Sequence, residues 1–344
     1  MYAWIIVFLI LLCLPGFYLI KRTKASTRPI HGTESIAQLE RVRLGDVDQW
    51  VLMRGKRRDN PVLLFLHGGP GMPTMYLAHH FQHPLESDFT VVHWDRRGAG
   101  KSYNPNLPVE SLSVSQLIAD TRELTNLLRQ RFGQNKIYLV GHSWGTYLGM
   151  WVIQRYPGLF HAYIGVGQLT TRGHDSPEIA EIQDRFIRQQ AEQRRDQKTL
   201  NELAAGRGEA LRETHLFRFG GEIRGATSMW PLLWIGLRAP EYTLAEAARL
   251  GQASSFVARN LRYDLSEERL IDAVRQVQIP IYFFTGRHDY TDPFELTQQY
   301  FELIQAPHKE LVWFEKSAHF PFLEEPDRFA EAMLKIKGKS NIGL

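Results

Sequence analysis

Ile137-Tyr138-Leu139-Val140-Gly141-His142-Ser143-Trp144-Gly145 is the stretch that decides the fold. Its first four residues form a short apolar run typical of a buried strand, and residues 144–156 have the pattern of a helix. A Gly-x-Ser-x-Gly motif between a strand and a helix forms a tight turn, which exposes the serine hydroxyl at the edge of a sheet. The small flanking residues suit that turn, and the helix amino terminus points toward the reacting oxygen. The sequence therefore predicts Ser143 as a catalytic nucleophile.

Short apolar runs alternate with amphipathic helices on both sides of this motif. Such alternation is typical of a parallel sheet with crossover helices, so we expect an α/β fold with a mostly parallel central sheet. Ser113 is a candidate N-cap for a helix over residues 113–131. The predicted strands cover residues 62–66, 89–94, 136–140, 161–166, 281–285 and 311–314.

The alternation stops between residues 168 and 272, where the chain has helical patterns only. We expect this segment to be a helical cap inserted between strands of a core formed by residues 39–167 and 273–344, lying over the strand carboxyl ends where such sheets bind ligands. An apolar patch from Met229 to Leu237 contains Trp230 and Trp234. These two tryptophans are candidate substrate contacts, and packing of the cap against the core is the equally weighted alternative.

A serine hydroxyl needs a neighbouring base to become a good nucleophile. In a sheet of this kind the acid and then the histidine follow the serine along the chain. His319 is the histidine near the end of the chain that follows a final strand, and Asp289 follows the strand of residues 281–285. Asp292 is the alternative acid. The sequence thus predicts a triad of Ser143, Asp289 and His319.

Acyl transfer also needs two backbone N–H donors for the developing oxyanion. Trp144, directly after the nucleophile, is one predicted donor. Gly69, in the loop His67-Gly68-Gly69-Pro70-Gly71 after the strand of residues 62–66, is the other. Arg96 or Arg97 is expected to buttress the site by pairing with an acid.

Together these motifs resemble the proline iminopeptidase (prolyl aminopeptidase) family of the α/β-hydrolase fold. The resemblance is carried by the segments 67–71, 94–102, 141–146, 286–289 and 317–319. It implies acyl-enzyme hydrolysis, a helical cap and a preference for a free N-terminal residue, and it assigns the same triad. The chain departs from the family at Arg96, where glutamine is usual, and at His142, where glycine is usual.

In this family, cap glutamates bind the amino group of the substrate. Glu213 stands in Glu213-Thr214-His215-Leu216-Phe217, which is similar to the family's E-N-H-Y-F segment, and Glu222 lies close by. The resemblance therefore implies Glu213 and Glu222 as amine ligands. A glutamate on an amphipathic helix is more commonly a solvated residue, which is the alternative for Glu213.

Composition limits the partners of the protein. The first 28 residues hold four basic and no acidic side chains, so the remainder balances at 37 of each. A balanced surface argues against nucleic acid, which requires a basic patch. The one cysteine, Cys13, lies outside the expected core. His79, His80 and His83 have no Asp, Glu or Cys at ligand spacing, and the proposed chemistry needs no metal or cofactor.

The amino terminus is predicted to be a membrane anchor. Residues 2–20 are uncharged and mostly apolar, and at about 1.5 Å per residue they would span a hydrocarbon core of about 30 Å. A cleaved signal peptide is the alternative. Residues 1–20 are thus expected to anchor the chain, with 21–38 as a linker and the enzyme on the cytoplasmic side.

The function expected from the sequence is a serine hydrolase with a small-molecule or short-peptide substrate, led by an aminopeptidase. An esterase, amidase or lactonase acting on a small apolar acyl group is the first alternative. A non-catalytic, membrane-tethered binding protein is the remote alternative, and it would require decay of an essential position. The sequence leaves the oligomeric state open.

Overall fold

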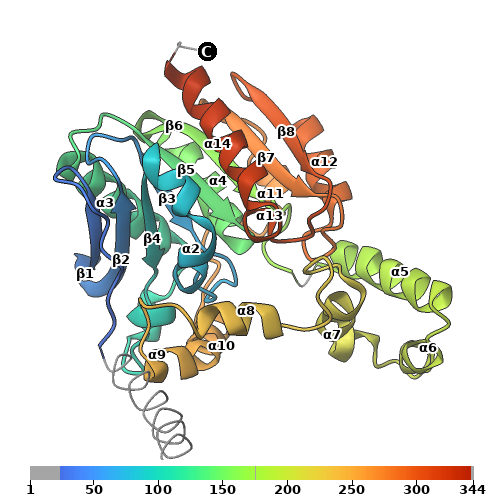
Figure 1. Cartoon of the computed structure of the whole chain (residues 1–344). Helices are drawn as coiled ribbons and strands as arrows, with labels where there is room; N and C mark the ends of the chain where they lie inside the picture. Colours follow the sequence, from blue (N-terminus) through green and yellow to red (C-terminus); the bar gives the residue numbers. More distant parts are fainter. Residues whose placement is uncertain (1–23, 175, 342–344) are drawn as a thin grey trace, which may run out of the picture.

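The computed structural model describes residues 24–174 and 176–341, whose strands form one eight-stranded sheet in the order β1-β2-β4-β3-β5-β6-β7-β8 (Figure 1). The strands from β3 onward run parallel, and β2 pairs antiparallel with both β1 and β4. The strands are β1 (Ile36–Leu44), β2 (Val47–Gly55), β3 (Val62–Leu66), β4 (Thr90–Asp95), β5 (Ile137–His142), β6 (Phe160–Val166), β7 (Ile281–Gly286) and β8 (Lys309–Phe314).

The predicted α/β fold is confirmed, and each predicted strand is present with ends shifted by at most two residues. β3, β4, β5 and β7 are buried along their whole length, which explains their continuous apolar sequences. The hairpin of β1 and β2 was not predicted. β1 starts at Ile36, inside the predicted linker, and it carries Glu40, Arg41 and Arg43 on a half-buried edge, so its apolar signal is weak.

Helices cover both faces of the sheet. α3 (Val114–Arg131), α4 (Trp144–Arg155) and α12 (Phe294–Leu303) pack on one face. α2 (Met75–Phe81), α13 (Pro321–Glu324) and α14 (Pro326–Asn341) pack on the other. Ser113 caps α3 as predicted, because its hydroxyl accepts the N–H of Gln116 at 3.2 Å.

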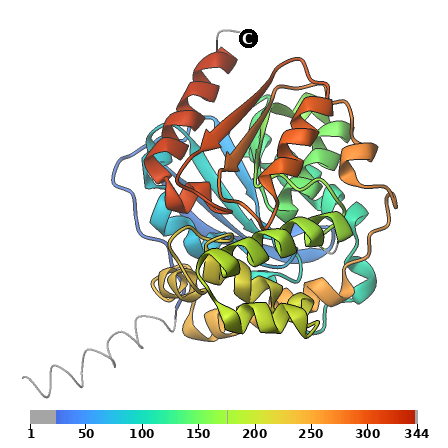
Figure 2. The ribbon, with the colours of Figure 1, turned by 90° about the vertical axis from the view of Figure 1, so that its right-hand side faces the viewer.

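A group of helices between β6 and β7 lies across one end of the sheet (Figures 1 and 2). We call α5 to α10 the cap helices; the short α11 (Leu270–Ala273) then leads back toward β7. α5 packs against α6 and α7, and α8 packs against α2 of the core. The cap helices are α5 (Pro177–Gln193), α6 (Gln197–Ala204), α7 (Gly208–Phe219), α8 (Trp230–Gly236), α9 (Leu244–Ala248) and α10 (Leu250–Asn260).

The structure contradicts the membrane localisation expected from the sequence. Within residues 24–174 and 176–341, no helix combines the length and the apolar character that crossing a membrane requires. The predicted anchor, residues 1–20, and the first three residues of the predicted linker lie outside the described part of the chain. The single-pass localisation with a cytoplasmic enzyme is therefore withdrawn.

Candidate active site

Ser143 lies at a sharp turn between β5 and α4, in the strand-turn-helix context that the sequence predicts. Its backbone has φ 53° and ψ −128°, a conformation that residues with side chains rarely adopt. A Cβ on Gly141 would lie 2.7 Å from the Gly145 oxygen, and one on Gly145 would lie 2.2 Å from the Leu66 oxygen. Both flanking residues must therefore be glycine for the turn to pack against the sheet.

His319 and Asp289 form a buried pair beside this turn. Nδ1 of His319 lies 3.0 Å from Oδ2 of Asp289, and both side chains are almost completely buried. The other carboxylate oxygen accepts the N–H groups of Thr291 and Asp292, each at 3.0 Å, so the carboxylate is held in place. Burial lowers the pKa of His319, but the carboxylates of Asp289, Glu222 and Asp292 together outweigh burial, and the pKa lies above the usual 6.5.

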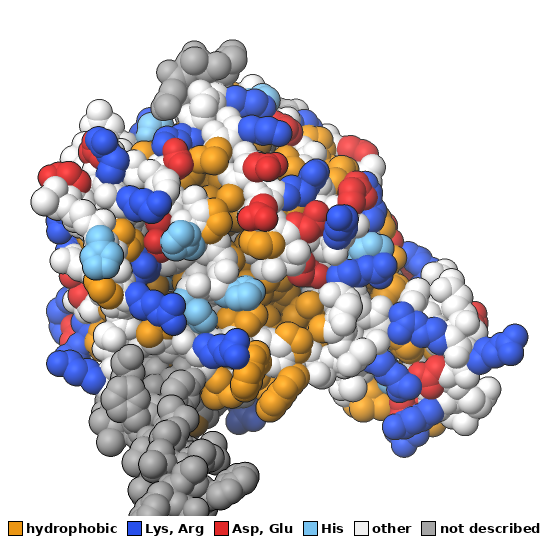
Figure 3. Space-filling model, in the orientation of Figure 1, with side chains coloured by type: hydrophobic (Ala, Val, Ile, Leu, Met, Phe, Trp, Pro, Cys, Tyr) orange, Lys and Arg blue, Asp and Glu red, His pale blue; other side chains and the backbone are white. Residues whose placement is uncertain are grey.

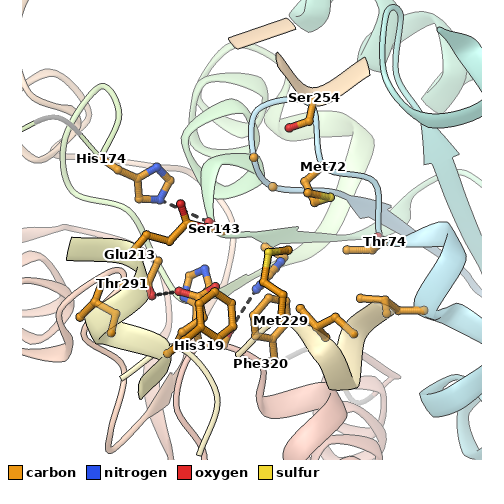
Figure 4. Close-up of a pocket in the computed structure, with 18 of the residues that line it drawn as sticks. Met72, Thr74, Ser143, His174, Glu213, Met229, Ser254, Thr291, His319 and Phe320 are labelled. Carbon is orange, nitrogen blue, oxygen red and sulfur yellow. Dashed lines mark hydrogen bonds between the residues drawn. The ribbon is translucent and has the colours of Figure 1, made fainter. Parts of the chain in front are cut away.

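A second histidine, which the sequence analysis missed, also lies at the nucleophile (Figure 4). Nε2 of His174 is 3.4 Å from Oγ of Ser143 and 3.1 Å from Oδ1 of Asp292. Asp292, the alternative acid, thus pairs with His174, whereas Asp289 pairs with His319. His174 lies in the loop after β6, and this position beyond the carboxyl end of a parallel strand was the one available signal.

The glycine-rich loop after β3 lies against Ser143. A Cβ on Gly68 would lie 2.8 Å from Cβ of Ser143, so this close approach requires glycine. Gly69 has φ 107°, in the region that favours glycine, and it lines the same cavity as Ser143. Trp144 is the first residue of α4. The two predicted oxyanion donors therefore both adjoin the nucleophile.

The two arginines after β4 have different partners. Arg97 pairs with Asp120 through two buried contacts of 2.6 and 2.8 Å, as the sequence predicts for one of them. The guanidinium of Arg96 donates instead to the carbonyl of Pro70 at 2.8 Å and lies over the Trp144 ring, 5.1 Å from its centre. Because Pro70 follows Gly69, Arg96 holds the glycine-rich loop in position.

His142 occupies the position where the resembling family has glycine. Its Nε2–H donates to the carbonyl of His319 at 3.0 Å, and the two rings lie 4.8 Å apart. Burial lowers the pKa of His142 to about 3, so the ring is neutral at physiological pH. His142 therefore supports the backbone of the loop that carries His319.

A cavity of about 470 Å³ lies between the sheet edge and the cap helices (Figure 4). Core residues Ser143 and His319 line it together with His174. Apolar side chains from both regions complete its wall: Met72, Leu77, Leu216, Met229, Leu232 and Phe320. A volume of this order holds a small ligand rather than a folded protein segment.

Both predicted glutamates line this cavity. Glu222 accepts a hydrogen bond from the Thr291 hydroxyl, and its own backbone carbonyl accepts the N–H of His319 at 3.0 Å. Burial raises the pKa of Glu222. Glu213 lies on α7, and the neighbouring Arg212 is paired with Asp184 at 3.0 Å. The cavity thus brings two carboxylates to the nucleophile.

The two tryptophans predicted as substrate contacts do not line the cavity. Trp230 is 64% exposed and Trp234 48%, because they lie on the outer side of α8. Met229 and Leu232 of the same segment face inward and line the cavity instead. Figure 3 shows hydrophobic side chains exposed over this part of the molecule. The apolar patch was identified correctly, but the prediction chose the wrong side of the helix.

The chain is a member of the α/β-hydrolase fold family, whose sequence model matches residues 61–326. It is therefore an enzyme of the hydrolase class. Among curated proteins it is 32% identical to the probable aminopeptidase YbaC of Bacillus subtilis (strain 168), over 87% of this chain and 96% of that protein. It is 26% identical to the proline iminopeptidase of Heyndrickxia coagulans, over 78% of this chain and 87% of that protein.

Solved structures support the same fold. The proline iminopeptidase of Mycobacterium smegmatis superposes with a TM-score of 0.64 at 18% identity, covering 89% of this chain and 99% of that one. A proline iminopeptidase-related protein of Thermus thermophilus gives a TM-score of 0.61 at 21% identity, covering 88% and 97%. These structures show the fold, and the sequence matches to the two curated relatives confirm the predicted resemblance to the proline iminopeptidase family.

Proposed function

We propose that this hydrolase is an aminopeptidase that releases N-terminal residues from small peptides, with Ser143 as nucleophile, His319 as base and Asp289 as the orienting acid. The observation that carries the proposal is the joint lining of one cavity by Ser143, His319 and the carboxylates of Glu213 and Glu222. The named activities of the two curated relatives support the same reaction.

Acylation begins when His319 removes the proton of the Ser143 hydroxyl. The 3.0 Å contact of Nδ1 with Asp289 fixes the ring tautomer, so Nε2 is the nitrogen that accepts the proton. In the free protein Oγ of Ser143 contacts His174, and rotation about the Cα–Cβ bond brings Oγ to His319. Such contacts commonly tighten only when substrate is bound.

The attack of Ser143 on the scissile carbonyl creates a negatively charged oxygen. The backbone N–H groups of Gly69 and Trp144 stabilise this charge, and each such donor contributes about 10²- to 10³-fold to the rate. His319 then gives its proton to the leaving amine. Water then attacks the acyl-enzyme. His319 removes a proton from the water and returns it to Oγ of Ser143 as the acyl group leaves.

The charges in the cavity favour a substrate that carries a free amino group. Three glutamates line the cavity, Glu209, Glu213 and Glu222, and Asp289 and Asp292 lie behind His319 and His174, so five carboxylates stand against at most two imidazolium groups. Arg212 also lines the cavity, but its charge is matched by Asp184. A protonated amine therefore gains from this field, whereas an N-blocked substrate does not.

An esterase, amidase or lactonase acting on a small apolar acyl group is the second candidate. It is supported by the apolar wall that Met72, Leu77, Met229, Leu232 and Phe320 provide. A short apolar acyl chain would bury well against these side chains without using either glutamate.

The test compares the full-length wild type with Ser143→Ala on three substrate sets. These are prolyl and alanyl arylamides, the same arylamides with a blocked amino group, and p-nitrophenyl acetate and butyrate. We expect the wild type to cleave the free arylamides and to cleave the blocked forms at least about 100-fold more slowly. Ser143→Ala should cleave neither the free nor the blocked arylamides.

Each outcome decides one part of the proposal. Ester cleavage without arylamide cleavage, lost in Ser143→Ala, would retain the serine mechanism and replace the aminopeptidase by an esterase. Arylamide cleavage that persists in Ser143→Ala would refute the assignment of the nucleophile.

A further inference from the structure

Ser143 is flanked by two histidine–aspartate pairs, and only one of them has a part in the mechanism above. His174 belongs to the loop after β6, and its Nε2 lies 3.4 Å from the Ser143 oxygen (Figure 4). Asp292, which holds it at 3.1 Å, is 2% exposed, and the His174 side chain is 30% exposed toward the cavity. A buried carboxylate with a histidine partner at the nucleophile requires an explanation beyond packing.

The contact with Asp292 fixes the direction of the interaction between His174 and Ser143. Nε2 of His174 carries a proton because it faces the Asp292 carboxylate at 3.1 Å, so toward Oγ, 3.4 Å away, it can only donate, and its one N–H is shared between the two oxygens. Burial and His319 lower the pKa of His174, but Asp292 and Glu222 outweigh them and raise it. His174 is therefore a donor toward Oγ through Nε2, whereas His319 donates to Asp289 through Nδ1 and keeps Nε2 as the accepting nitrogen.

A donor at Oγ affects the two halves of the reaction differently. In acylation the contact of His174 with Oγ is already present in the free protein, so it gives the attack no additional stabilisation. In deacylation Oγ is the leaving atom, and a donor stabilises the negative charge that develops as the bond to carbon breaks. The benefit of His174 therefore falls on the second half of the reaction.

We propose that His174, held by Asp292, is a further catalytic residue that donates a hydrogen bond to Oγ of Ser143 as the acyl group is hydrolysed. The inference rests on the proposed serine mechanism but not on the identity of the acyl group. His319 first takes a proton from water, whose oxygen bonds to the acyl carbon. The C–Oγ bond then breaks, its electron pair stays on Oγ, and His319 returns its proton to Oγ. His174 keeps its own proton throughout.

The test uses full-length protein and stopped-flow hydrolysis of p-nitrophenyl acetate, whose first product is released by acylation alone. In His174→Ala we expect kcat to fall about tenfold while kcat/KM stays within about twofold. A burst of p-nitrophenol close to one equivalent should appear, and mass spectrometry should detect the acetylated protein. His174→Gln retains a neutral N–H donor and should show an intermediate kcat.

Asp292→Asn and Arg172→Ala serve as the matched variants. Asp292→Asn removes the carboxylate that keeps the proton on Nε2 of His174 and should reproduce the lower kcat and the burst. Arg172 lies in the same loop but contacts Tyr263, 5.3 Å from the ring centre, so Arg172→Ala should leave both constants unchanged.

Other results would overturn the inference. A parallel fall of kcat and kcat/KM in His174→Ala would show a structural role, and unchanged constants would show none. Persistence of the wild-type reaction in Ser143→Ala would refute the serine mechanism itself. That result can be told apart from a failure of the His174 proposal. The role of His174 is tested only on a wild-type activity that is lost in Ser143→Ala.

Discussion

The sheet edge and the cap helices contribute to the same cavity under different constraints. At the sheet edge the backbone itself determines the residue type, since Gly145 would place a Cβ 2.2 Å from a carbonyl oxygen and Ser143 has a positive φ. In the cap, Glu213 and Leu232 reach the cavity from ordinary helices that would accept many other residues. Strict motifs therefore mark the first region, whereas the second carries only the loose similarity of residues 213–217.

This difference separates chemistry from selectivity. Substitutions at the sheet edge should reduce catalysis for every substrate, because in the proposed mechanism they affect groups that act on the reacting bond. Substitutions in the cap should change the ranking of substrates while the reaction itself persists. The following predictions test that division, from the largest expected effect to the smallest.

The largest effect is expected when the acid of the His319 pair is neutralised. Asp289→Asn keeps the shape of the side chain but favours the wrong tautomer of His319, and we expect kcat to fall about 10³- to 10⁴-fold on arylamides and esters alike. Steady-state kinetics on both substrates measure this. Circular dichroism checks that the variant is folded.

Asp292→Asn is the matched control at the sheet edge, since it lies three residues away and pairs with the other histidine. We expect its loss to stay near tenfold and to be confined to kcat. Equal losses in the two variants would mean that the two pairs are interchangeable, and the distinction between base and donor would be refuted.

The next effect tests the cap. Glu213→Gln removes a charge that faces the cavity, and a charge-assisted hydrogen bond contributes about 1.5 to 3 kcal/mol. We therefore expect kcat/KM for free arylamides to fall about 10- to 100-fold, with ester hydrolysis unchanged. Glu192→Gln, an exposed position on α5, is the control. An equal loss on esters would contradict the division between chemistry and selectivity.

The sequence predicted the sheet edge in detail because its constraints are local. The glycines, the serine and the strand before them are consecutive, and Asp289 and His319 each follow a strand in a known order. His174 was missed because a lone histidine in a loop has no spacing that marks it. Trp230 and Trp234 were misplaced because an apolar patch on a short helix does not reveal which side meets the core.

A smaller effect is expected on pH dependence. In the proposed mechanism neutral His319 is the active form, and the carboxylates of Asp289, Glu222 and Asp292 raise its pKa against the effect of burial. In the pH profile of kcat/KM for p-nitrophenyl acetate, the midpoint of the fall toward acidic pH, called the acidic limb, should therefore lie above pH 6.5. Glu222→Gln removes one negative charge, which destabilises the imidazolium, so the limb should move to lower pH by less than about one unit.

Esters are the substrate of choice for this measurement, because they have no amino group for Glu222 to bind. Glu202→Gln, on α6, is the control. A limb that moves to higher pH would contradict the sign of the interaction. An unmoved limb would show that Glu222 does not act on His319 through its charge.

The smallest effect is expected for substitutions on the outer side of α8. The outer and inner sides of this one helix can then be compared directly. Trp230→Ala and Trp234→Ala should leave kcat/KM on every substrate within about twofold and stability within about 0.5 kcal/mol, because both side chains are largely exposed and neither lines the cavity. Leu232→Ala, on the inner side, should lower stability by about 2 to 5 kcal/mol and change KM, because Leu232 is 4% exposed and lines the cavity.

Thermal unfolding and arylamide kinetics measure both effects. If the tryptophans changed KM as much as Leu232, the substrate would have to extend over the outer side of α8, and the cavity alone would no longer account for selectivity.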